Sequence, residues 1–387
     1  MCGLLVSGLR MVSGFAVWDM LGQAPIRLEA GLKEKNEMLP HIPELDGVRG
    51  IAILVVLITH FYDPVQAAAP FGSLTRVISH GGAGVDLFFV LSGFLITGIL
   101  VSTKDAVNYF RAFYARRAVR IFPLYIVVVF FFFYVAVPIS QHYGKDMWVQ
   151  PREQIWYWLF LANWRHALGY NDGAQLAHFW SLAIEEQFYL GWSLVVWFAS
   201  RRSMPMISLG VILAVVIGRT VAAAHGVSGL FLYFSTVTRL DSLAFGALLS
   251  VSLRTREFFG RFAFLILPGC IVLVLVGMPL QVTMLLYGIG SAALVGLATT
   301  RSVPLLRVRW LRTFGKYSYG LYVLHYLFHG LFVLGVGYMK PLPFAVLSIT
   351  FGIALSFGAA WVSWKVLETP FLKLKKRYKY RFVDAAV

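Results

Sequence analysis

Cysteine is nearly absent from this sequence. The 387 residues contain only Cys2 and Cys270, which excludes a disulfide framework and a cysteine-based metal cluster. Charged residues make up 13% of the chain, well below the share of about a quarter that is typical of soluble domains. No glycine-rich phosphate loop follows a strand pattern, and no zinc-binding spacing occurs. The sequence therefore gives no sign of a nucleotide-binding fold or of a metal site.

Apolar residues dominate instead. They make up 59% of the chain, aromatic residues make up 16%, and the mean hydropathy is +0.73. Apolar runs of membrane-crossing length recur along nearly the whole sequence. We therefore predict an all-α integral membrane protein with about ten transmembrane helices in one bundle. The ten segments are Val48–Tyr62, Val85–Val101, Ile121–Val137, Phe179–Ser200, Met206–Ala224, Phe231–Val251, Phe262–Gly277, Val282–Ala298, Tyr317–Gly337 and Phe344–Val366.

The basic residues predict the orientation of the chain. A net charge of +16 could indicate nucleic-acid binding, but the positive charges fall in short clusters between apolar segments, so we expect no nucleic-acid partner. If the first segment starts in the cytoplasm, nearly all the clusters lie on the cytoplasmic side and both termini are cytoplasmic. Only a few basic residues then remain outside, namely Arg76, Lys145, Arg152, Arg165 and Lys340. The aromatic stretch Ile155–Leu161 is too short to cross, and we expect an interfacial or re-entrant piece on the outer side.

The apolar segments divide the chain into three parts. Residues 1–40 are mildly apolar with interspersed charges, and we interpret them as a variable leader that is cytoplasmic or interfacial. Residues 41–372 form the transmembrane domain. Residues 373–387 form a basic cytoplasmic tail.

A histidine lies inside the first apolar segment. His60 follows Arg49 by eleven residues, which places it about 16 Å along a helix and near the middle of a bilayer about 30 Å thick. An ionisable side chain at that depth is costly, so it is a candidate functional residue. The alternative is a structural histidine that hydrogen-bonds to a neighbouring helix.

Further charged residues lie inside later segments. Glu185 and Glu186 are in the fourth segment, and Arg239 and Asp241 are in the sixth. We expect these side chains to face the bundle interior and to pair with one another. The alternative is a purely structural ion-pair network in which Glu185 or Asp241 neutralises Arg239. His325 and His329 lie one helical turn apart in the ninth segment.

A cluster of arginines precedes the third segment. The stretch Arg111–Pro123 contains four arginines within ten residues, at helical spacing. Arginine binds phosphate in a fork geometry that lysine does not reproduce. The alternative is ordinary positive-inside charge or contact with anionic lipid.

Several motifs together resemble acyltransferase family 3, a family of integral membrane proteins. Arg49 and His60 match its arginine–ten residues–histidine signature. The resemblance covers residues 41 to about 372, and further motifs follow in the family's order. These motifs are Gly84–Ile96, Arg117–Pro123, Phe179–Tyr189, Arg239–Gly246, Ser318–His325 and Trp364–Pro370.

The resemblance implies transfer of an acyl group, with acetyl expected, from a cytoplasmic acyl-CoA to a hydroxyl of a sugar-containing acceptor. The acceptor is a surface polysaccharide, a lipid-linked glycan or a secondary metabolite, and the expected location is the bacterial inner membrane. No metal is expected. We expect the CoA phosphates to be held by four arginines, and three further residues to contact substrate. The arginines are Arg49, Arg116, Arg117 and Arg120, and the substrate contacts are Ser181, Tyr189 and His325.

His60 suits the role of general base, because the pKa of histidine lies near the operating pH. A carboxylate on its other ring nitrogen would fix the tautomer, with Glu185 expected first and Glu186 and Asp241 behind it. Asp63 is a further candidate. Arg239 would offset the oxyanion. In the alternative mechanism, His60 carries the acyl group covalently.

Two other function classes compete. Ten helices with buried charges also suit a proton-coupled transporter of a glycan or lipid, although no matching pair of broken segments indicates an inverted repeat. A structural scaffold leaves the buried charges unexplained. The chain ends soon after the tenth segment, so we expect no hydrolase-like domain and an acceptor other than peptidoglycan. The sequence does not indicate an oligomeric state.

Overall fold

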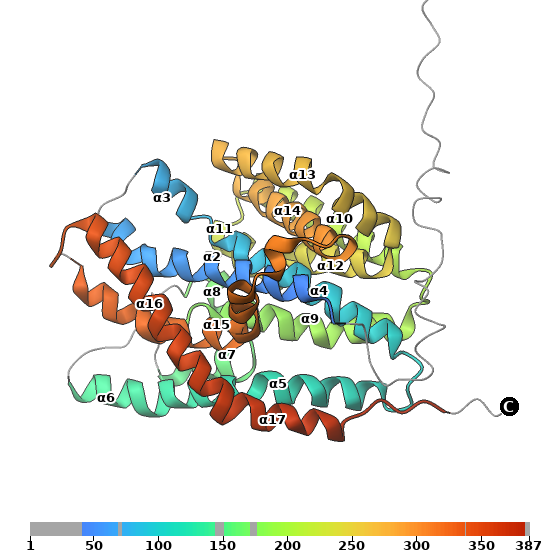
Figure 1. Ribbon diagram of the computed structural model, residues 1–387, viewed down its shortest axis with the longest axis horizontal. Helices are drawn as coiled ribbons and strands as arrows, with labels where there is room; N and C mark the ends of the chain where they lie inside the picture. The colour runs from blue at the N-terminus through green and yellow to red at the C-terminus, as the bar shows by residue number, and fades with distance from the viewer. Residues whose placement is uncertain (1–40, 69–71, 144–150, 171–175, 337, 384–387) are drawn as a thin grey trace, which may run out of the picture.

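The protein is an all-helical bundle in the part of the chain that the structure describes. The computed structural model describes residues 41–68, 72–143, 151–170, 176–336 and 338–383, and every regular element in these ranges is a helix. Figure 1 shows most of the long helices running side by side. The predicted all-α fold class is thereby confirmed. The leader at residues 1–40 and Lys145 lie outside the described residues.

Each of the ten predicted segments overlaps helical residues. Among the described residues, seven helical stretches are long and apolar enough to cross a membrane, so the chain is a multi-pass membrane protein. The count of ten crossings stays a prediction, because the fourth, sixth and ninth segments are not among the seven. The long helices are α2 (Pro43–Ala68), α4 (Gly82–Ser102), α5 (Tyr109–Phe131), α9 (Phe179–Phe198), α10 (Met204–Ala224), α13 (Leu253–Val276), α14 (Leu280–Thr300), α15 (Arg309–Gly335) and α16 (Pro341–Ser363).

The sixth segment is broken, contrary to the continuous helix that we predicted. It consists of α11 (Gly229–Phe234), a 3₁₀ turn η3 (Thr236–Thr238) and α12 (Leu240–Val251). Hydroxyl side chains at the break compete with the helix, since Thr238 donates to the carbonyl of Ser235 at 3.0 Å. Arg219 of α10 donates to the carbonyl of Thr238 at 2.7 Å. The break is therefore stable at depth because other side chains satisfy the freed backbone groups.

Shorter elements extend or link the long helices. The third segment runs further than predicted, because α5 continues through a π-helical turn into α6. The aromatic stretch Ile155–Leu161 lies in the short helix α7 and the turn that leads to α8, and Phe160 in that turn packs its ring on Tyr125 at 4.3 Å between centroids. These elements are α3 (Ser73–Ile78), η1 (Phe132–Ala136), α6 (Val137–His142), η2 (Pro151–Glu153), α7 (Gln154–Trp158), α8 (Ala162–Ala167), η4 (Pro304–Arg307), η5 (Trp364–Glu368), α17 (Thr369–Lys373) and η6 (Leu374–Arg377).

Glycines bring α2 and α15 into backbone contact. A Cβ atom on Gly315 of α15 would lie 1.8 Å from the carbonyl oxygen of Asp46, and one on Gly50 of α2 would lie 2.1 Å from that of Leu311. Such approaches are possible only without a side chain. The two helices that carry His60 and His325 are therefore fixed against each other at their first turns.

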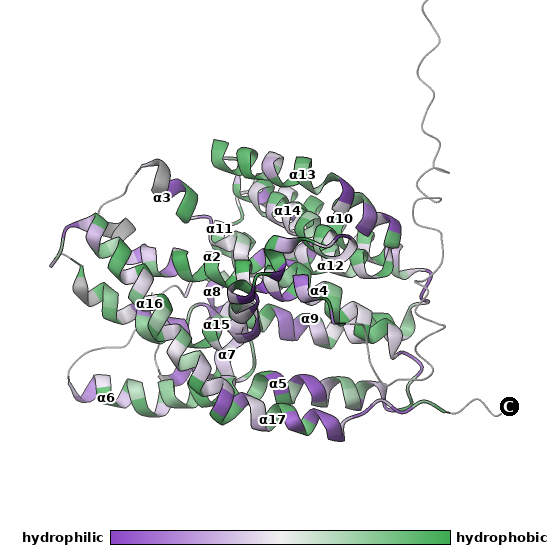
Figure 2. Cartoon of the chain, in the orientation of Figure 1, coloured by the Kyte–Doolittle hydropathy of each residue, from purple (hydrophilic) through white to green (hydrophobic). Residues whose placement is uncertain are grey.

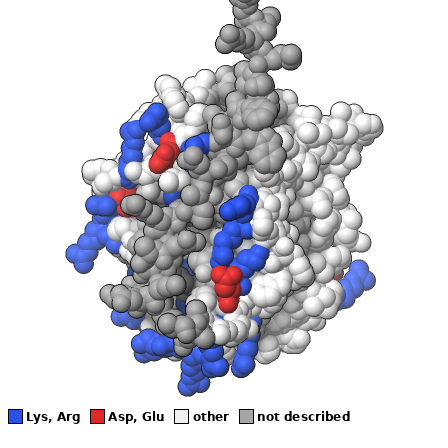
Figure 3. Space-filling view, turned by 90° about the vertical axis from the view of Figure 1, so that its right-hand side faces the viewer, with Lys and Arg blue, Asp and Glu red and all other residues white. Residues whose placement is uncertain are grey.

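Basic side chains gather at one end of the bundle. Figure 3 looks onto the end where α2 begins and α9 ends, and lysines and arginines surround this face with few acidic residues among them. Figure 2 shows the same separation, with hydrophilic residues at the right-hand ends of α5, α13 and α17 and apolar residues over most of the helices. This end is the predicted cytoplasmic end, and we refer to it so below. Its sidedness rests on the positive-inside rule and stays a prediction.

Candidate functional site

Four ring side chains meet inside the bundle between α2, α9 and α15. We call His60, His178, His325 and Tyr326 the histidine layer. Nδ1 of His60 lies 2.8 Å from Nε2 of His325. The ring of His178 lies 4.9 Å from that of His325 and 4.8 Å from that of Tyr326, between centroids. In the described ranges, no three His, Cys, Asp or Glu side chains are grouped to hold a metal ion.

The ring partner of His60 differs from the one that we expected. The imidazole of His325 occupies the position where we expected the carboxylate of Glu185, Glu186 or Asp241. Glu185 lies seven residues after His178 on α9, about 10 Å nearer the cytoplasmic end at 1.5 Å per residue. Asp63 forms no hydrogen bond with His60 in the described structure, and its charge acts on Tyr326.

A second polar group lies between this layer and the cytoplasmic end. We call Arg49, Arg117, Arg120, Glu185 and Glu186 the arginine layer. The charges that act most strongly on Arg120 are those of Arg49 and Arg117, and Arg117 in turn acts on both glutamates. Within the described part of the chain, neither Arg117 nor Arg120 forms a salt bridge. Two guanidinium groups with free donors therefore converge beneath the histidines.

Tyr189 organises part of the arginine layer. Its hydroxyl donates to Oε2 of Glu185 at 2.7 Å, and the guanidinium of Arg117 lies 5.4 Å from the centre of its ring. The hydroxyl of Ser92 on α4 lies 2.5 Å from the same phenol oxygen. We expected Tyr189 to contact substrate, and the structure places it in the arginine layer, against Glu185 and Arg117.

Arg116 faces away from the arginine layer. It donates to the carbonyl of Tyr378 at 3.3 Å and lies over the ring of Tyr380. Adjacent residues on a helix point about 100° apart, so Arg116 and Arg117 contact different neighbours. Burial raises the pKa of the Tyr380 hydroxyl above its ordinary value. The C-terminal segment therefore engages Arg116, which we had expected to bind the donor.

The tail is held against the start of α5 by backbone contacts. The amide of Val107 donates to the carbonyl of Arg381 at 2.9 Å, and the side chain of Asn108 bonds to both Lys379 and Arg381. These bonds fix the Tyr378–Arg381 segment beside Arg116.

Arg239 and Asp241 each have a buried partner other than the one we expected. Arg239 pairs with Asp86 of α4 at 2.9 Å, not with Glu185 or Asp241. Asp241 pairs with Arg219 of α10 at 2.7 Å. All four side chains are at most 2% exposed. In the described structure, neither Arg239 nor Asp241 forms a hydrogen bond or salt bridge with His60.

Ser181 joins two helices. Its hydroxyl lies 2.6 Å from that of Tyr322, which donates to the carbonyl of His178 at 2.8 Å. It was expected to contact substrate, and the structure gives it a partner on α15 instead. Two residues of the site were missed by sequence reasoning, His178 and Tyr326. The available signal for His178 was its place directly before the fourth segment, which begins at Phe179.

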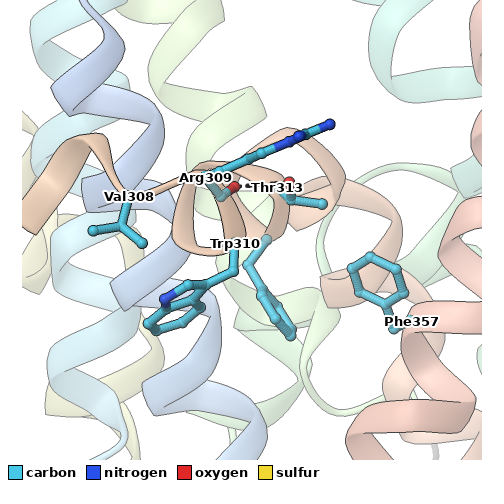
Figure 4. Close-up of a pocket in the computed structure, with 6 residues that line it drawn as sticks. Val308, Arg309, Trp310, Thr313 and Phe357 are labelled. Carbon is cyan, nitrogen blue, oxygen red and sulfur yellow. Dashed lines mark hydrogen bonds between the residues drawn. The ribbon is translucent and has the colours of Figure 1, made fainter.

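A shallow apolar hollow lies at the start of α15, away from the histidine layer. Figure 4 shows it between the first turns of α15 and the side of α16, with Trp310 and Phe357 on its walls. Trp310 precedes His325 by fifteen residues, about 22 Å along α15. An exposed tryptophan at a helix start is typical of the membrane interface. The hollow is therefore separate from the histidine layer.

Comparison with known proteins identifies similar chains. Residues 42–364 match a family model described as an acyltransferase domain. The chain is 31% identical over 244 residues to O-acetyltransferase OatA of Staphylococcus aureus, covering 56% of this chain and 36% of that protein. It is 30% identical over 331 residues to the putative peptidoglycan O-acetyltransferase YrhL of Bacillus subtilis, covering 76% of this chain and 49% of that protein.

A third relative is the peptidoglycan O-acetyltransferase OatA of Listeria monocytogenes, 30% identical over 227 residues, which are 54% of this chain and 34% of that protein. The chain thus matches between a third and a half of the length of these relatives. The word peptidoglycan stands in the names of two of these relatives. Our expectation of another acceptor stays a prediction. No solved structure matches the chain.

Proposed function

The chain belongs to the acyltransferase family whose domain model covers residues 42–364, and on this premise we propose that it is a membrane-embedded O-acyltransferase. It moves an acyl group, acetyl first, from acyl-CoA on the cytoplasmic side to a hydroxyl of a sugar-containing acceptor. Its location is the inner membrane of a bacterium, as the bacterial relatives suggest.

One observation carries the proposal, the arrangement of the two polar layers within the same helices. α2 contributes Arg49 to the arginine layer and His60 to the histidine layer, and α9 contributes Glu185 and His178 in the same way. About 16 Å of helix separates Arg49 from His60. The bundle has guanidinium groups that can bind phosphate at one depth and an imidazole with an unused nitrogen at a greater depth. This arrangement suits an acyl donor that enters from one side and reacts further inside the bundle.

The arginine layer holds the donor phosphates. Arg117 and Arg120 have donors not used in salt bridges, and Arg49 keeps one bond to Asp46 at 3.0 Å. Guanidinium groups form strong charge-assisted bonds to phosphate oxygens. Arg116 is left out of this set, because the C-terminal segment engages it. The pantetheine arm then extends from the phosphates toward His60.

His60 removes the proton of the acceptor hydroxyl. The oxygen bonds to the thioester carbonyl carbon, the carbon–sulfur bond breaks, and the proton passes from His60 to the departing CoA sulfur. The net change is one ester formed and one thioester consumed. A covalent acyl-histidine, in which Nε2 attacks the thioester first, is the alternative route.

Arg239 and Asp241 have a structural role in this proposal. Their pairing with Asp86 and Arg219 neutralises four buried charges, and it holds the broken sixth segment against α4 and α10. Removing one partner of such a pair leaves an uncompensated buried charge.

The acceptor is a hydroxyl of a cell-envelope glycan. The names of two relatives make peptidoglycan the first candidate to test. Lipid-linked glycans and surface polysaccharides are tested beside it.

The proposal is tested with membrane vesicles of defined sidedness. Inside-out vesicles from cells that express the protein receive radiolabelled acetyl-CoA, and alkali-labile label in the glycan fraction is counted. We expect label with the wild type, none with His60→Ala at equal protein level, and none when sealed right-side-out vesicles receive the same donor. Equal labelling by wild type and His60→Ala would remove His60 from the mechanism, and equal labelling of both vesicle types would refute a cytoplasmic donor site.

A further inference from the structure

The two imidazoles of the histidine layer lie edge to edge. Their planes are 9° from parallel, their centroids are 5.0 Å apart, and the nearest nitrogens are 2.8 Å apart. Two rings stacked face to face do not bring atoms much closer than about 3.5 Å. The nitrogens therefore meet in the plane of the rings, along the lone-pair direction that a hydrogen bond requires.

The other nitrogen of His325 shows which way this hydrogen bond runs. Nδ1 of His325 lies 2.7 Å from the carbonyl oxygen of Tyr322 and 3.1 Å from that of Leu321. A carbonyl oxygen only accepts, so Nδ1 of His325 carries a hydrogen. Both carbonyls belong to α15 itself, so the helix that bears His325 fixes this assignment.

The charge state of His325 follows from its surroundings. Its side chain is 0% exposed, and in the described structure its hydrogen-bond partners are His60 and the two carbonyls, with no carboxylate among them. A buried cation without a counter-ion is costly. His325 is therefore neutral, and its Nε2 carries a lone pair.

We infer that His325 is a positioning residue that holds His60 in a single tautomer, with the hydrogen on Nδ1 and the lone pair on Nε2. Nδ1 of His60 must donate, because Nε2 of His325 can only accept. Nε2 of His60, which has no hydrogen-bond partner in the described structure, is then the atom that takes the proton of the acceptor hydroxyl. This inference rests on the proposed function, and it adds the reacting atom and the group that selects it.

The arrangement also supports His60 while it holds the proton. The acceptor proton on Nε2 makes the ring a cation, and the Nδ1–H bond to Nε2 of His325 spreads that charge over two rings. The cycle closes when the proton leaves Nε2 for the CoA sulfur. His325 itself exchanges no proton with substrate, because its only outward nitrogen accepts the bond from His60.

The tautomer is measured directly by ¹⁵N NMR of protein labelled at histidine, in detergent or lipid. The signals of His60 are identified as those lost in His60→Gln. We expect one nitrogen with a protonated shift and one with an unprotonated shift, and a coupling that places the hydrogen on Nδ1. A hydrogen on Nε2, or equal population of both tautomers, would overturn the inference without any variant of His325.

Two variants test the consequence for turnover. Gln at position 325 keeps an acceptor oxygen within reach of Nδ1 of His60, whereas Phe keeps a ring of similar volume and removes the acceptor. We expect His325→Phe to lower kcat roughly 100-fold or more, as when the group that orients a catalytic histidine is lost, and His325→Gln to stay within about tenfold of the wild type. The KM for acetyl-CoA should not change, because the arginine layer is untouched.

The outcomes separate this inference from the proposed function. Loss of activity in His60→Ala together with full activity in His325→Phe would keep the proposed function and overturn the role of His325. Full activity in both would overturn the proposed function. His225→Phe is the control, since His225 is exposed and bonds only to the carbonyl of Val221 in its own helix. If His325→Phe fails to accumulate in membranes, the comparison of His325→Gln with His325→Ala and the NMR assignment decide the question.

Discussion

At the scale of single residues, chemistry at this site depends on which nitrogen or guanidinium is free to act. Nδ1 of His60 bonds to His325, and one nitrogen of Arg116 donates to the carbonyl of Tyr378 in the C-terminal segment. In the proposed function, Nε2 of His60 and the guanidinium groups of Arg117 and Arg120 act on substrate. Residue type alone does not separate these groups, since the adjacent arginines Arg116 and Arg117 contact different neighbours.

Arg117 and Arg120 should control donor affinity. We expect the double variant Arg117→Ala, Arg120→Ala to raise the KM for acetyl-CoA by about 100-fold or more, because each charge-assisted bond contributes about 1.5–3 kcal/mol and two are lost. Initial rates of transfer at varied acetyl-CoA concentration measure the change. Arg116→Ala is the matched control and should stay within about threefold of the wild type. Equal effects of the double variant and of Arg116→Ala would return all three arginines to topology or lipid contact.

The pair of Asp86 and Arg239 should matter for stability and not for chemistry. Arg239→Gln leaves a buried carboxylate without its counter-ion, which costs about 3–5 kcal/mol, so we expect little folded protein. Adding Asp86→Asn removes the second charge and should restore the thermal unfolding midpoint in detergent. The restored double variant should also transfer acyl groups. A stable double variant that is inactive would give Arg239 the catalytic role that we first expected.

At the scale of elements, the register of α2 against α15 places His60 beside His325. The contact is made at the first turns, where Gly315 meets the backbone of Asp46 and Gly50 meets that of Leu311. Both helices then carry a histidine deeper in the bundle. A small separation of the helices at these glycines would lengthen the 2.8 Å contact between the imidazoles.

Gly315→Ala should therefore reduce activity and stability together. A Cβ atom there would lie 1.8 Å from the carbonyl oxygen of Asp46, and relieving the overlap should cost about 1–3 kcal/mol. Gly330→Ala on the same helix is the control, because nothing lies within 4 Å of its added Cβ atom. Unfolding midpoints and transfer rates of both variants check this. If Gly315→Ala changes neither the unfolding midpoint nor the transfer rate, residues other than these glycines determine the register of α2 against α15.

The helices were largely predictable from the sequence, and their breaks were not. Apolar runs located all ten segments, because length and hydropathy are local properties. The break at Ser235–Arg239 was missed, since it depends on a side chain from α10 that satisfies the carbonyl of Thr238. Hydropathy along one segment does not contain that information.

The sequence identified residues of the site, but not the pairs that they form. His60 was identified because a lone ionisable side chain at mid-membrane depth is costly. Its partner His325 is 265 residues away along the chain, and only the packing of α15 on α2 brings the two together. Asp86, the partner of Arg239, sat in a motif that we had read only as a family signature. A single sequence gives the cost of burying a charge, and it does not say which charge offsets that cost.

At the scale of the whole molecule, charge sets the orientation. Exposed arginines surround the end where α2 begins (Figure 3), and the arginine layer lies nearer this end than the histidine layer does. A donor in the cytoplasm reaches the arginine layer only if this end faces the cytoplasm. The proposed function therefore requires that the end where α2 begins faces the cytoplasm.

Cysteine labelling tests that orientation. Cys2 and Cys270 are first replaced by serine, and then Arg152→Cys and Arg202→Cys are made at exposed positions at opposite ends. We expect a membrane-impermeant maleimide to label Arg152→Cys in intact spheroplasts, and Arg202→Cys only after permeabilisation. The reverse pattern would place the arginine layer outside and would refute a cytoplasmic donor.

Mass spectrometry of the cell envelope tests most directly whether this protein transfers an acyl group to a glycan hydroxyl with His60 as the base. Peptidoglycan fragments, lipid-linked glycans and surface polysaccharides are compared among cells that lack the gene and cells complemented with the wild type or with His60→Ala. The account predicts an acyl ester on one glycan class with the wild type, and its absence from the other two strains. The same ester in all three strains, or in the strain with His60→Ala at wild-type level, would contradict it.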